Sequence, residues 1–469
     1  MLKFNKNSKT LEQDEYKYQL QNPEIPNLYR DIYSYGEVPK IPFNHRIVPM
    51  NTPEEIWMTD TTFRDGQQSL PPFTVKQIVD LYTMLHKLSG SNGMIKQCEF
   101  FLYTEKDRKA VDKCRERGYK FPEITGWIRA VKEDFKLVKD MGLKETGILT
   151  SVSDYHIFLK LKKSRKQAMD DYLGIVKSAL SLGIIPRCHF EDITRADFYG
   201  FVVPFALELM KLSKLANIPV KIRACDTLGY GVTYPGVALP RSVKGLCYGL
   251  TELAGVPSEY LEWHGHNDFH KAVINASTAW LYGCGVANGS LLGIGERTGN
   301  TPLESLVIEF IELRGTTNGM DTTIIADITK YFEEEIGYKI PKNQPFVGAN
   351  FNVTKAGIHA DGIMKNEEIY NIFDTKKILK REVDVEITDK SGLSGITFWI
   401  NSRLNLKGTS KIEKSHPAVK SIKLWIDTEY VSGRTTAISE QEMWAFVEEY
   451  LPDLLKKVEK VGKVKEVKK

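Results

Sequence analysis

The feature that most constrains the fold of this chain is a regular alternation of strand-like and helix-like segments that begins at Ile56. Short apolar runs are separated by stretches with apolar residues at helical spacing, such as 75–88, 166–182 and 271–282. We expect eight strands, at 56–60, 95–103, 122–129, 145–151, 186–192, 220–227, 261–268 and 288–295. Eight strand–helix units in roughly 255 residues favour an α/β fold of the closed (β/α)8 kind, a TIM barrel, over an open doubly wound sheet.

The segments outside this alternation predict the domain organisation. Residues 1–50 are polar and dotted with aromatics, and we expect an N-terminal arm that wraps the body or a partner subunit. The catalytic barrel is expected at 51–319, with a capping box over 301–304 that starts its last helix. A mainly helical lid or dimerisation region should cover 320–455, with a break near Ser391, followed by a Lys-rich tail at 456–469.

Charge and cysteine content exclude several classes of protein. The chain has a net charge of +4, but the tail carries seven Lys and two Glu (+5), so the remainder is near −1 and offers no basic body for nucleic acid. No apolar run is long enough to span a membrane, and the N-terminus lacks the apolar core of a signal peptide. The six cysteines form no CxxC pair. We therefore expect a cytoplasmic protein with reduced thiols.

Two polar clusters, about two hundred residues apart, predict a metal site. Asp65 lies in the turn after the first strand, and His264 and His266 lie two residues apart on the seventh, so that both imidazoles share one face. The first and seventh strands of a barrel end at the same rim, which would let Asp65 add a carboxylate. An isolated HxH motif is weak, but its combination with the RDGQQ turn in an eight-unit barrel is much stronger. Two imidazoles with oxygen ligands suit a divalent cation, Mn²⁺ first, with Mg²⁺, Co²⁺ or Zn²⁺ as alternatives.

The fifth strand places Arg187, His189 and Glu191 on a single face. Charged groups inside a barrel are costly unless they are paired or bind a ligand. With Glu191 at the rim, Arg187 would lie about 13 Å deeper along the strand. Two interpretations stay open: Arg187 grips the far carboxylate of a substrate, or it closes the barrel through an ion pair with Glu191.

Three other segments could contribute to the same site. Thr227 shares one face of the sixth strand with Arg223. The Gly-rich segment 293–300 lacks GxGxxG spacing, so a phosphate or metal role after the eighth strand suits it better than dinucleotide binding. His359 is either a loop histidine or a catalytic base with charged neighbours.

Four motifs in combination resemble one family. The DTTFRDGQQ turn, the HGHND strand, GIGERTGN and the PFVGAN…GIHADGIMKN segment are similar to those of the 2-isopropylmalate, homocitrate and (Re)-citrate synthases, metal-dependent barrel enzymes that transfer acyl groups. The resemblance runs from about Ile56 to Asn401. It implies a Claisen condensation of acetyl-CoA with an α-keto acid, followed by thioester hydrolysis. It also implies a homodimer, in which the segment after the barrel of one subunit caps the site of the other.

The resemblance also implies roles for individual residues. Asp65, His264 and His266 would be metal ligands, with Asn300 near the metal. Arg64 would stabilise the oxygen that gains charge, while Glu191 and His359 transfer protons with support from Tyr370. The residues expected to contact the keto acid are Gln68, Arg187, His189 and Thr227. These roles fit the chemistry, which needs a polarised carbonyl, a base for a weakly acidic methyl group and a fixed cation.

Departures within the family favour a dicarboxylic keto acid. Homocitrate synthases resemble this chain in having Arg four residues before the strand-five Glu, where isopropylmalate synthases typically have an acidic residue. An unpaired Arg187 buried against an isopropyl group would cost several kcal/mol. The long arm, and RDGQQ in place of the frequent RDGEQ, are most similar to the (Re)-citrate synthases. We therefore expect oxaloacetate as the keto acid and citrate as the product.

Four alternatives are kept. Within the family, these are a homocitrate synthase acting on 2-oxoglutarate and a 2-isopropylmalate synthase acting on 2-oxoisovalerate. A metal-dependent barrel hydrolase would also use an HxH motif, although usually near the first strand. A metal-storing or regulatory barrel would leave Arg64, Glu191 and His359 without a role.

Overall fold

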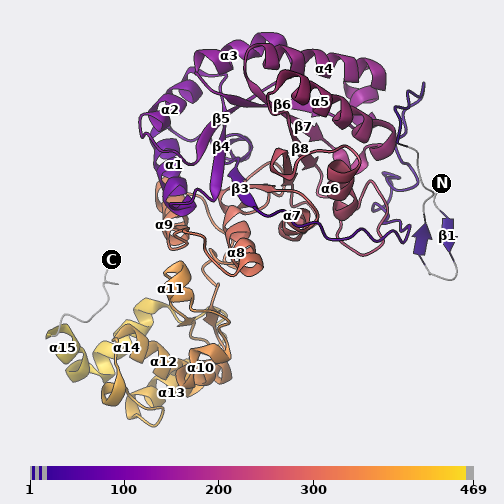
Figure 1. The fold of residues 1–469 in the computed structure, drawn as a ribbon. Helices are drawn as coiled ribbons and strands as arrows, with labels where there is room; N and C mark the ends of the chain where they lie inside the picture. Colours follow the sequence, from indigo (N-terminus) through magenta and orange to yellow (C-terminus); the bar gives the residue numbers. More distant parts are fainter. Residues whose placement is uncertain (1–2, 6–9, 13–17, 461–469) are drawn as a thin grey trace. The chain divides into compact units, whose positions relative to one another are not determined.

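A computed structural model describes residues 3–5, 10–12 and 18–460, and its first unit is built on a closed barrel of eight parallel strands (Figure 1). Neighbouring strands follow the chain order, and the last strand pairs with the first to close the barrel. The strands are β3 (Trp57–Asp60), β4 (Ile95–Phe101), β5 (Glu123–Ile128), β6 (Glu145–Ser151), β7 (Ile185–Glu191), β8 (Lys221–Asp226), β9 (Leu261–Gly265) and β10 (Val286–Gly289). The predicted (β/α)8 barrel is confirmed.

Helices cover the outer face of the barrel (Figure 1). The helix α1 buries Ile78, Leu81, Leu85 and Leu88, whose helical spacing predicted it, and Thr74 starts it with a capping box. The helices that follow the eight strands are α1 (Val75–Ser89), α2 (Glu105–Arg115), α3 (Phe135–Asp140), α4 (Arg165–Ser181), α5 (Val203–Ala216), α6 (Val243–Glu252), α7 (Ala272–Leu281) and α8 (Leu303–Arg314).

Two local predictions around the eighth strand are wrong. The strand ends at Gly289, because Leu292 takes a positive φ of 55° and turns the chain into a short 3-10 segment. The capping box at 301–304 does not form either. The Thr301 hydroxyl donates to the carbonyls of Gly265 and Ala272, and the Glu304 carboxylate accepts from the Leu292 amide. Thr301 thus ties this loop to the end of β9, and Glu304 fixes the turn that follows β10.

The chain divides into two units between Gly337 and Tyr338, later than the expected boundary at 319/320. The helix α9 (Ile324–Tyr331) and the π-helical turn 332–336 belong to the barrel unit. The reason is local packing against α1, where the Tyr331 hydroxyl donates to Asp80 at 2.8 Å.

The second unit is mainly helical, as expected. Its helices are α10 (Gly357–Lys365), α11 (Thr375–Leu379), α12 (Gly392–Arg403), α13 (Pro417–Val431), α14 (Glu440–Tyr450) and α15 (Pro452–Lys460), with a two-stranded sheet of β11 (Val353–Thr354) and β12 (Asp384–Val385). Buried Trp399, Ile400, Ile422 and Val447 join α12, α13 and α14 into one core. The end of the Lys-rich tail, 461–469, lies outside the described residues.

The N-terminal arm is held on the barrel unit by polar contacts. Residues 3–5 and 10–12 form the hairpin strands β1 (Lys3–Asn5) and β2 (Thr10–Glu12). Further along, the Asn27 amide donates to Asp154 at 2.7 Å, and the Tyr33 hydroxyl donates to the Thr194 carbonyl at 2.5 Å. Both partners follow the carboxyl ends of barrel strands. The arm therefore wraps the body beside the rim where ligands of such barrels bind.

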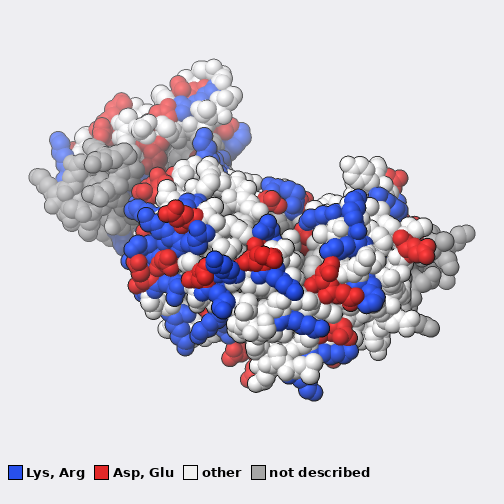
Figure 2. All heavy atoms as spheres, turned by 90° about the horizontal axis from the view of Figure 1, so that it is seen from above, with Lys and Arg blue, Asp and Glu red and all other residues white. Residues whose placement is uncertain are grey.

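The distribution of surface charge and the state of the cysteines agree with what the composition led us to expect. On the face in Figure 2, basic and acidic side chains are interspersed over the described residues. All six cysteines are free and buried. No helix among the described residues has the length and apolar character needed to cross a bilayer. Cytoplasmic location stays a prediction.

Candidate active site and metal centre

Asp65, His264 and His266 converge at the carboxyl ends of β3 and β9. The Nε2 atoms of His264 and His266 are 3.3 Å apart, and they lie 3.5 and 3.6 Å from Asp65 Oδ2. All three side chains are buried. Ligand bonds of about 2.0–2.2 Å around one ion place donor atoms at such separations. The structure brings the predicted ligand set together.

Two oxygen atoms at this site support a bound cation. Asp65 Oδ2 and Asn300 Oδ1 are buried without a hydrogen-bond partner. The Asn300 side chain donates its amide to the Ile294 carbonyl at 3.2 Å, and its backbone bridges to His266. A buried acceptor without a donor is costly, and a cation would satisfy both oxygens. Two imidazoles, a carboxylate and an amide oxygen form a mixed donor set that fits a divalent metal.

The protonation states suit metal binding. Burial lowers the pKa of His264 to about 3 and also lowers the pKa of His266, so both imidazoles are neutral near pH 7. Burial alone would raise the pKa of Asp65, but the nearby Arg64 guanidinium and the two imidazoles bring it down to about 2. The site therefore presents one carboxylate and two neutral ring nitrogens.

Asn288 orients His264. Its Oδ1 lies 2.7 Å from His264 Nδ1, and its amide nitrogen donates to Thr59 Oγ1 at 2.9 Å. The amide is thereby an acceptor toward the ring, which assigns the ring proton to Nδ1 and leaves Nε2 free for a metal. The sequence analysis missed Asn288, because its register opposite His264 appears only once the strands are paired.

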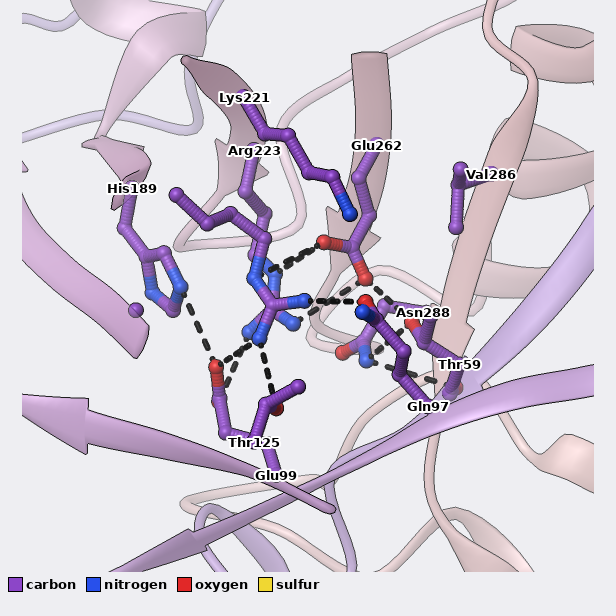
Figure 3. A network of polar contacts seen from close by, with 12 residues as sticks. Thr59, Gln97, Glu99, Thr125, His189, Lys221, Arg223, Glu262, Val286 and Asn288 are labelled. Carbon is purple, nitrogen blue, oxygen red and sulfur yellow. Dashed lines mark hydrogen bonds and ion pairs between the residues drawn. The ribbon is translucent and has the colours of Figure 1, made fainter. Parts of the chain in front are cut away.

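A buried carboxylate, Glu99 on β4, organises the barrel interior below the metal site. It accepts from Arg64 Nε at 2.8 Å, Arg187 Nη2 at 2.8 Å and Arg223 Nη1 at 2.9 Å. Figure 3 shows Glu99, from β4, in one polar network with Arg223 and Glu262, which come from the adjacent strands β8 and β9 on the other side of the barrel. Burial opposes the charge of Glu99, but Arg223, Arg64 and their neighbours hold its pKa well below the usual range. Glu99 was also missed from the sequence.

The structure corrects the expected environment of Arg187. Besides Glu99, the guanidinium donates to Glu145 Oε1 and Gln97 Oε1, both at 3.0 Å. Its charge is thus compensated within the protein, and the ion pair with Glu191 does not form either. Arg187 borders a cavity of about 220 Å³ together with residues at the starts of strands, among them Trp57, Lys221 and Val286. It lies toward the end of the barrel opposite the metal ligands, so the preference for a dicarboxylic keto acid cannot rest on an unpaired Arg187.

Glu191 is held at the rim by groups that the sequence analysis did not single out. The Ser151 hydroxyl donates to it, His156 Nδ1 lies 2.9 Å away and Lys160 Nζ 3.6 Å away. Burial raises the pKa of Glu191, but the contact with His156 and the other two donors lower it to about 2. Glu191 is therefore an ionised acceptor near neutral pH. Ser151 ends β6, and His156 and Lys160 follow it; no sequence motif had indicated these three partners.

The three remaining residues expected to contact the keto acid differ in burial and in the hydrogen bonds that they already make. His189 is buried with Nε2 3.3 Å from Glu99, and burial lowers its pKa to about 3. Thr227 accepts from the Asp192 amide at 2.8 Å. Gln68 is exposed in the turn after β3, where its backbone amide donates to the Asp65 carbonyl.

His359 and Tyr370 lie together in the second unit. Their ring centroids are 4.4 Å apart, and Thr354 Oγ1 lies 3.2 Å from His359 Nδ1. Both rings are exposed in the isolated chain, as are Ile358 and Ile372 beside them. The expected pairing of His359 with Tyr370 is present within this unit.

Comparisons with known proteins show the family and agree with the barrel fold. Residues 55–331 match the model of the HMGL-like family. The chain is 59% identical over 457 residues to citrate (Re)-synthase of Syntrophus aciditrophicus, covering 97% of this chain and 73% of that protein. It is 58% identical over 444 residues to citrate (Re)-synthase of Clostridium kluyveri, covering 95% and 98%. Among solved structures, hydroxymethylglutaryl-CoA lyase from Pseudomonas aeruginosa shares the fold, with a TM-score of 0.50, 19% identity and coverage of 62% and 96%.

We predict that His264→Ala abolishes tight binding of Mn²⁺ to protein first stripped of metal, as measured by titration calorimetry. Asn288→Ala should weaken binding by about 10–100-fold, because it frees the ring of the neighbouring ligand. His86→Ala, on α1, is the matched control and should bind as the wild type does. Equal affinity of His264→Ala and wild type would contradict the assignment.

We predict that Glu99→Gln lowers the free energy of unfolding by about 3–5 kcal/mol, because three guanidinium groups lose their shared carboxylate. Urea unfolding of metal-free protein measures the change. Glu312→Gln, an exposed substitution on α8 with the same loss of charge, should alter stability by less than about 0.5 kcal/mol. A Glu99→Gln protein as stable as this control would refute the central role of Glu99.

Proposed function

This chain belongs to the HMGL-like family, and from that premise we propose that it is a metal-dependent citrate (Re)-synthase. The enzyme would condense acetyl-CoA with oxaloacetate and release CoA as citrate forms. The observation that carries the proposal is the convergence of Asp65, His264 and His266, in a chain that is 58% identical over 95% of its length to a relative of that name.

The first step is binding of the keto acid beside the metal ligands. A divalent cation, with Mn²⁺ as our first choice, would be held by Asp65, His264, His266 and Asn300, and when bound it draws electron density from the ketone carbon. Gln68, in the turn after β3, and Thr227, directly after β8, would orient the keto acid by hydrogen bonds. His189, neutral and buried, would act below them as part of the wall.

Arg64 would stabilise the oxyanion that develops during condensation. Its Nε is fixed by Glu99 at 2.8 Å, and Nη1 lies 3.6 Å from Asp65 Oδ1. The guanidinium is therefore immobilised next to the metal ligands before any substrate binds. A charge placed in advance costs no reorganisation when the ketone oxygen becomes negative. In this proposal Arg187 acts indirectly, by sharing Glu99 with Arg64, and no longer as a direct substrate contact.

Proton transfer would be divided between the two units. A base removes a methyl proton from acetyl-CoA, and the resulting carbanion equivalent forms the C–C bond to the ketone carbon. His359, oriented by Thr354 and packed on Tyr370, suits the role of base. Water then breaks the thioester C–S bond, which releases CoA. Glu191 at the rim would join this proton transfer by accepting a hydrogen bond from that water and orienting it, since its lowered pKa makes it a weak base.

In a homodimer, the partner subunit would cover His359, which is exposed in the isolated chain. In the isolated chain, Ile358, Ile369, Tyr370 and Ile372 surround it with exposed apolar surface. Clustered apolar side chains of this kind mark an interaction surface. A second copy that covers this surface with its own barrel would remove it from water and bring His359 to the metal site of the partner.

Among keto acids supplied with acetyl-CoA and Mn²⁺, we expect oxaloacetate to give the highest kcat/KM, at least about 100-fold above 2-oxoisovalerate. Thiol release measures the rate, and cleavage of the labelled product by a stereospecific citrate lyase reports the face attacked. Equal or faster reaction with 2-oxoglutarate or 2-oxoisovalerate would contradict the proposal.

We further expect two inactive variants to restore activity in one another. A purified heterodimer of His264→Ala and His359→Ala subunits contains one intact shared site, so it should show about half of the wild-type activity. Each variant alone should be inactive. A heterodimer with no activity would place both groups of one site in the same subunit.

A further inference from the structure

The second unit contains a polar cavity that the proposed mechanism does not use. It has a volume of about 740 Å³, opens to solvent and is lined mainly by α10, α12 and the segment between Asn405 and Lys414. Its size exceeds what a keto acid needs and lies within the range of cavities that hold drug-sized ligands.

The cavity wall combines cationic and aromatic groups. Five lysines line it, against four acidic residues. Lys365 and Lys414 share Asp361, and Lys376 pairs with Glu382. Lys407 and Lys411, in contrast, are exposed and have no acidic partner among the residues that the structure describes. Two free ammonium groups four residues apart are suited to bind phosphate.

A buried hydroxyl points to a ligand independently of these charges. Thr397, on α12, is 3% exposed and lines the cavity, yet its Oγ1 has no hydrogen-bond partner. Buried polar groups are normally satisfied, and a rotation of the Thr397 side chain would let this hydroxyl reach a group bound in the cavity. The neighbouring Phe398 offers an aromatic face for a planar base.

The cavity and the proposed base lie on one helix. Asp361, Ile363 and Lys365 of α10 line the cavity, while His359 begins the same helix. Lys365 lies six residues after His359 on this helix, so the two residues are about 9 Å apart along the helix axis. The distance between base and cavity is therefore set within this unit, whatever its position against a barrel.

We propose that this cavity binds the adenosine 3′,5′-bisphosphate end of acetyl-CoA. Lys407 and Lys411 bind its phosphates, Thr397 hydrogen-bonds the nucleoside and Phe398 stacks on adenine. The pantetheine arm then leads from the cavity toward His359, which removes the methyl proton. This inference rests on the proposed function, because that function supplies acetyl-CoA as substrate. An adenine nucleotide acting as an effector would share much of this chemistry, and the tests below separate the two.

The first test compares acetyl-CoA with acetyl-pantetheine, which lacks the nucleotide. The double substitution K407E/K411E should raise the KM for acetyl-CoA at least about tenfold, with kcat and the KM for oxaloacetate within about twofold of the wild type. The KM for acetyl-pantetheine should not change. The control K420E/K456E alters the same charge at exposed positions away from the cavity and should leave every constant unchanged.

An unchanged KM for acetyl-CoA in K407E/K411E would overturn the proposal. An equal rise for acetyl-pantetheine would do so as well, because the effect would then not depend on the nucleotide.

The second test measures binding without catalysis, so it remains decisive if the wild type forms no citrate. The wild type should bind 3′,5′-ADP in titration calorimetry, and K407E/K411E should bind it at least about tenfold more weakly. Thr397→Val, which removes only the hydroxyl, should weaken binding as well. ATP bound as tightly as 3′,5′-ADP would assign the cavity to an effector and contradict a CoA subsite.

Discussion

The arrangement of the barrel interior depends on one buried carboxylate. Glu99 accepts hydrogen bonds from Arg64, Arg187 and Arg223, and burying these three guanidinium charges inside the barrel would be costly without compensating carboxylates. The contact with Arg64 reaches up to Asp65 at the rim, whereas the contact with Arg187 reaches down toward the starts of the strands. Glu99 therefore joins the structural end of the barrel to its reactive end.

The alternation of side chains along a strand separates these two ends into layers. On β9, Glu262 pairs with Arg223 in the interior and His264 lies one layer higher, while His266, expected on the same strand, comes just after its end at Gly265. The same register places Asn288 of β10 beside His264 and Thr59 of β3 beside Asn288. One strand and the residue after it thus supply a structural charge, a metal ligand held by a neighbouring strand and a second ligand. A shift of register by one residue would turn all three away from the interior.

The sequence was sufficient for features that follow from periodicity, motifs and the common rim of a parallel barrel, and insufficient for those that depend on which side chains meet inside the folded barrel. The eight strands and the Asp65–His264–His266 set follow from periodicity, from an HxH motif and from the rule that parallel strands end at one rim. Arg187 was placed on the correct face, but its partners Glu145 and Gln97 come from other strands, and no spacing predicts them. His156, which contacts Glu191, and the free Thr397 hydroxyl became visible only through packing.

The most direct test of this account is anomalous diffraction from crystals grown with Mn²⁺ and oxaloacetate. The account predicts one strong manganese peak within about 2.0–2.3 Å of Asp65 Oδ2, His264 Nε2 and His266 Nε2, with the keto acid in contact with it. A barrel without a peak at this position, or with manganese bound only elsewhere, would contradict the central claim that these three side chains form the metal centre.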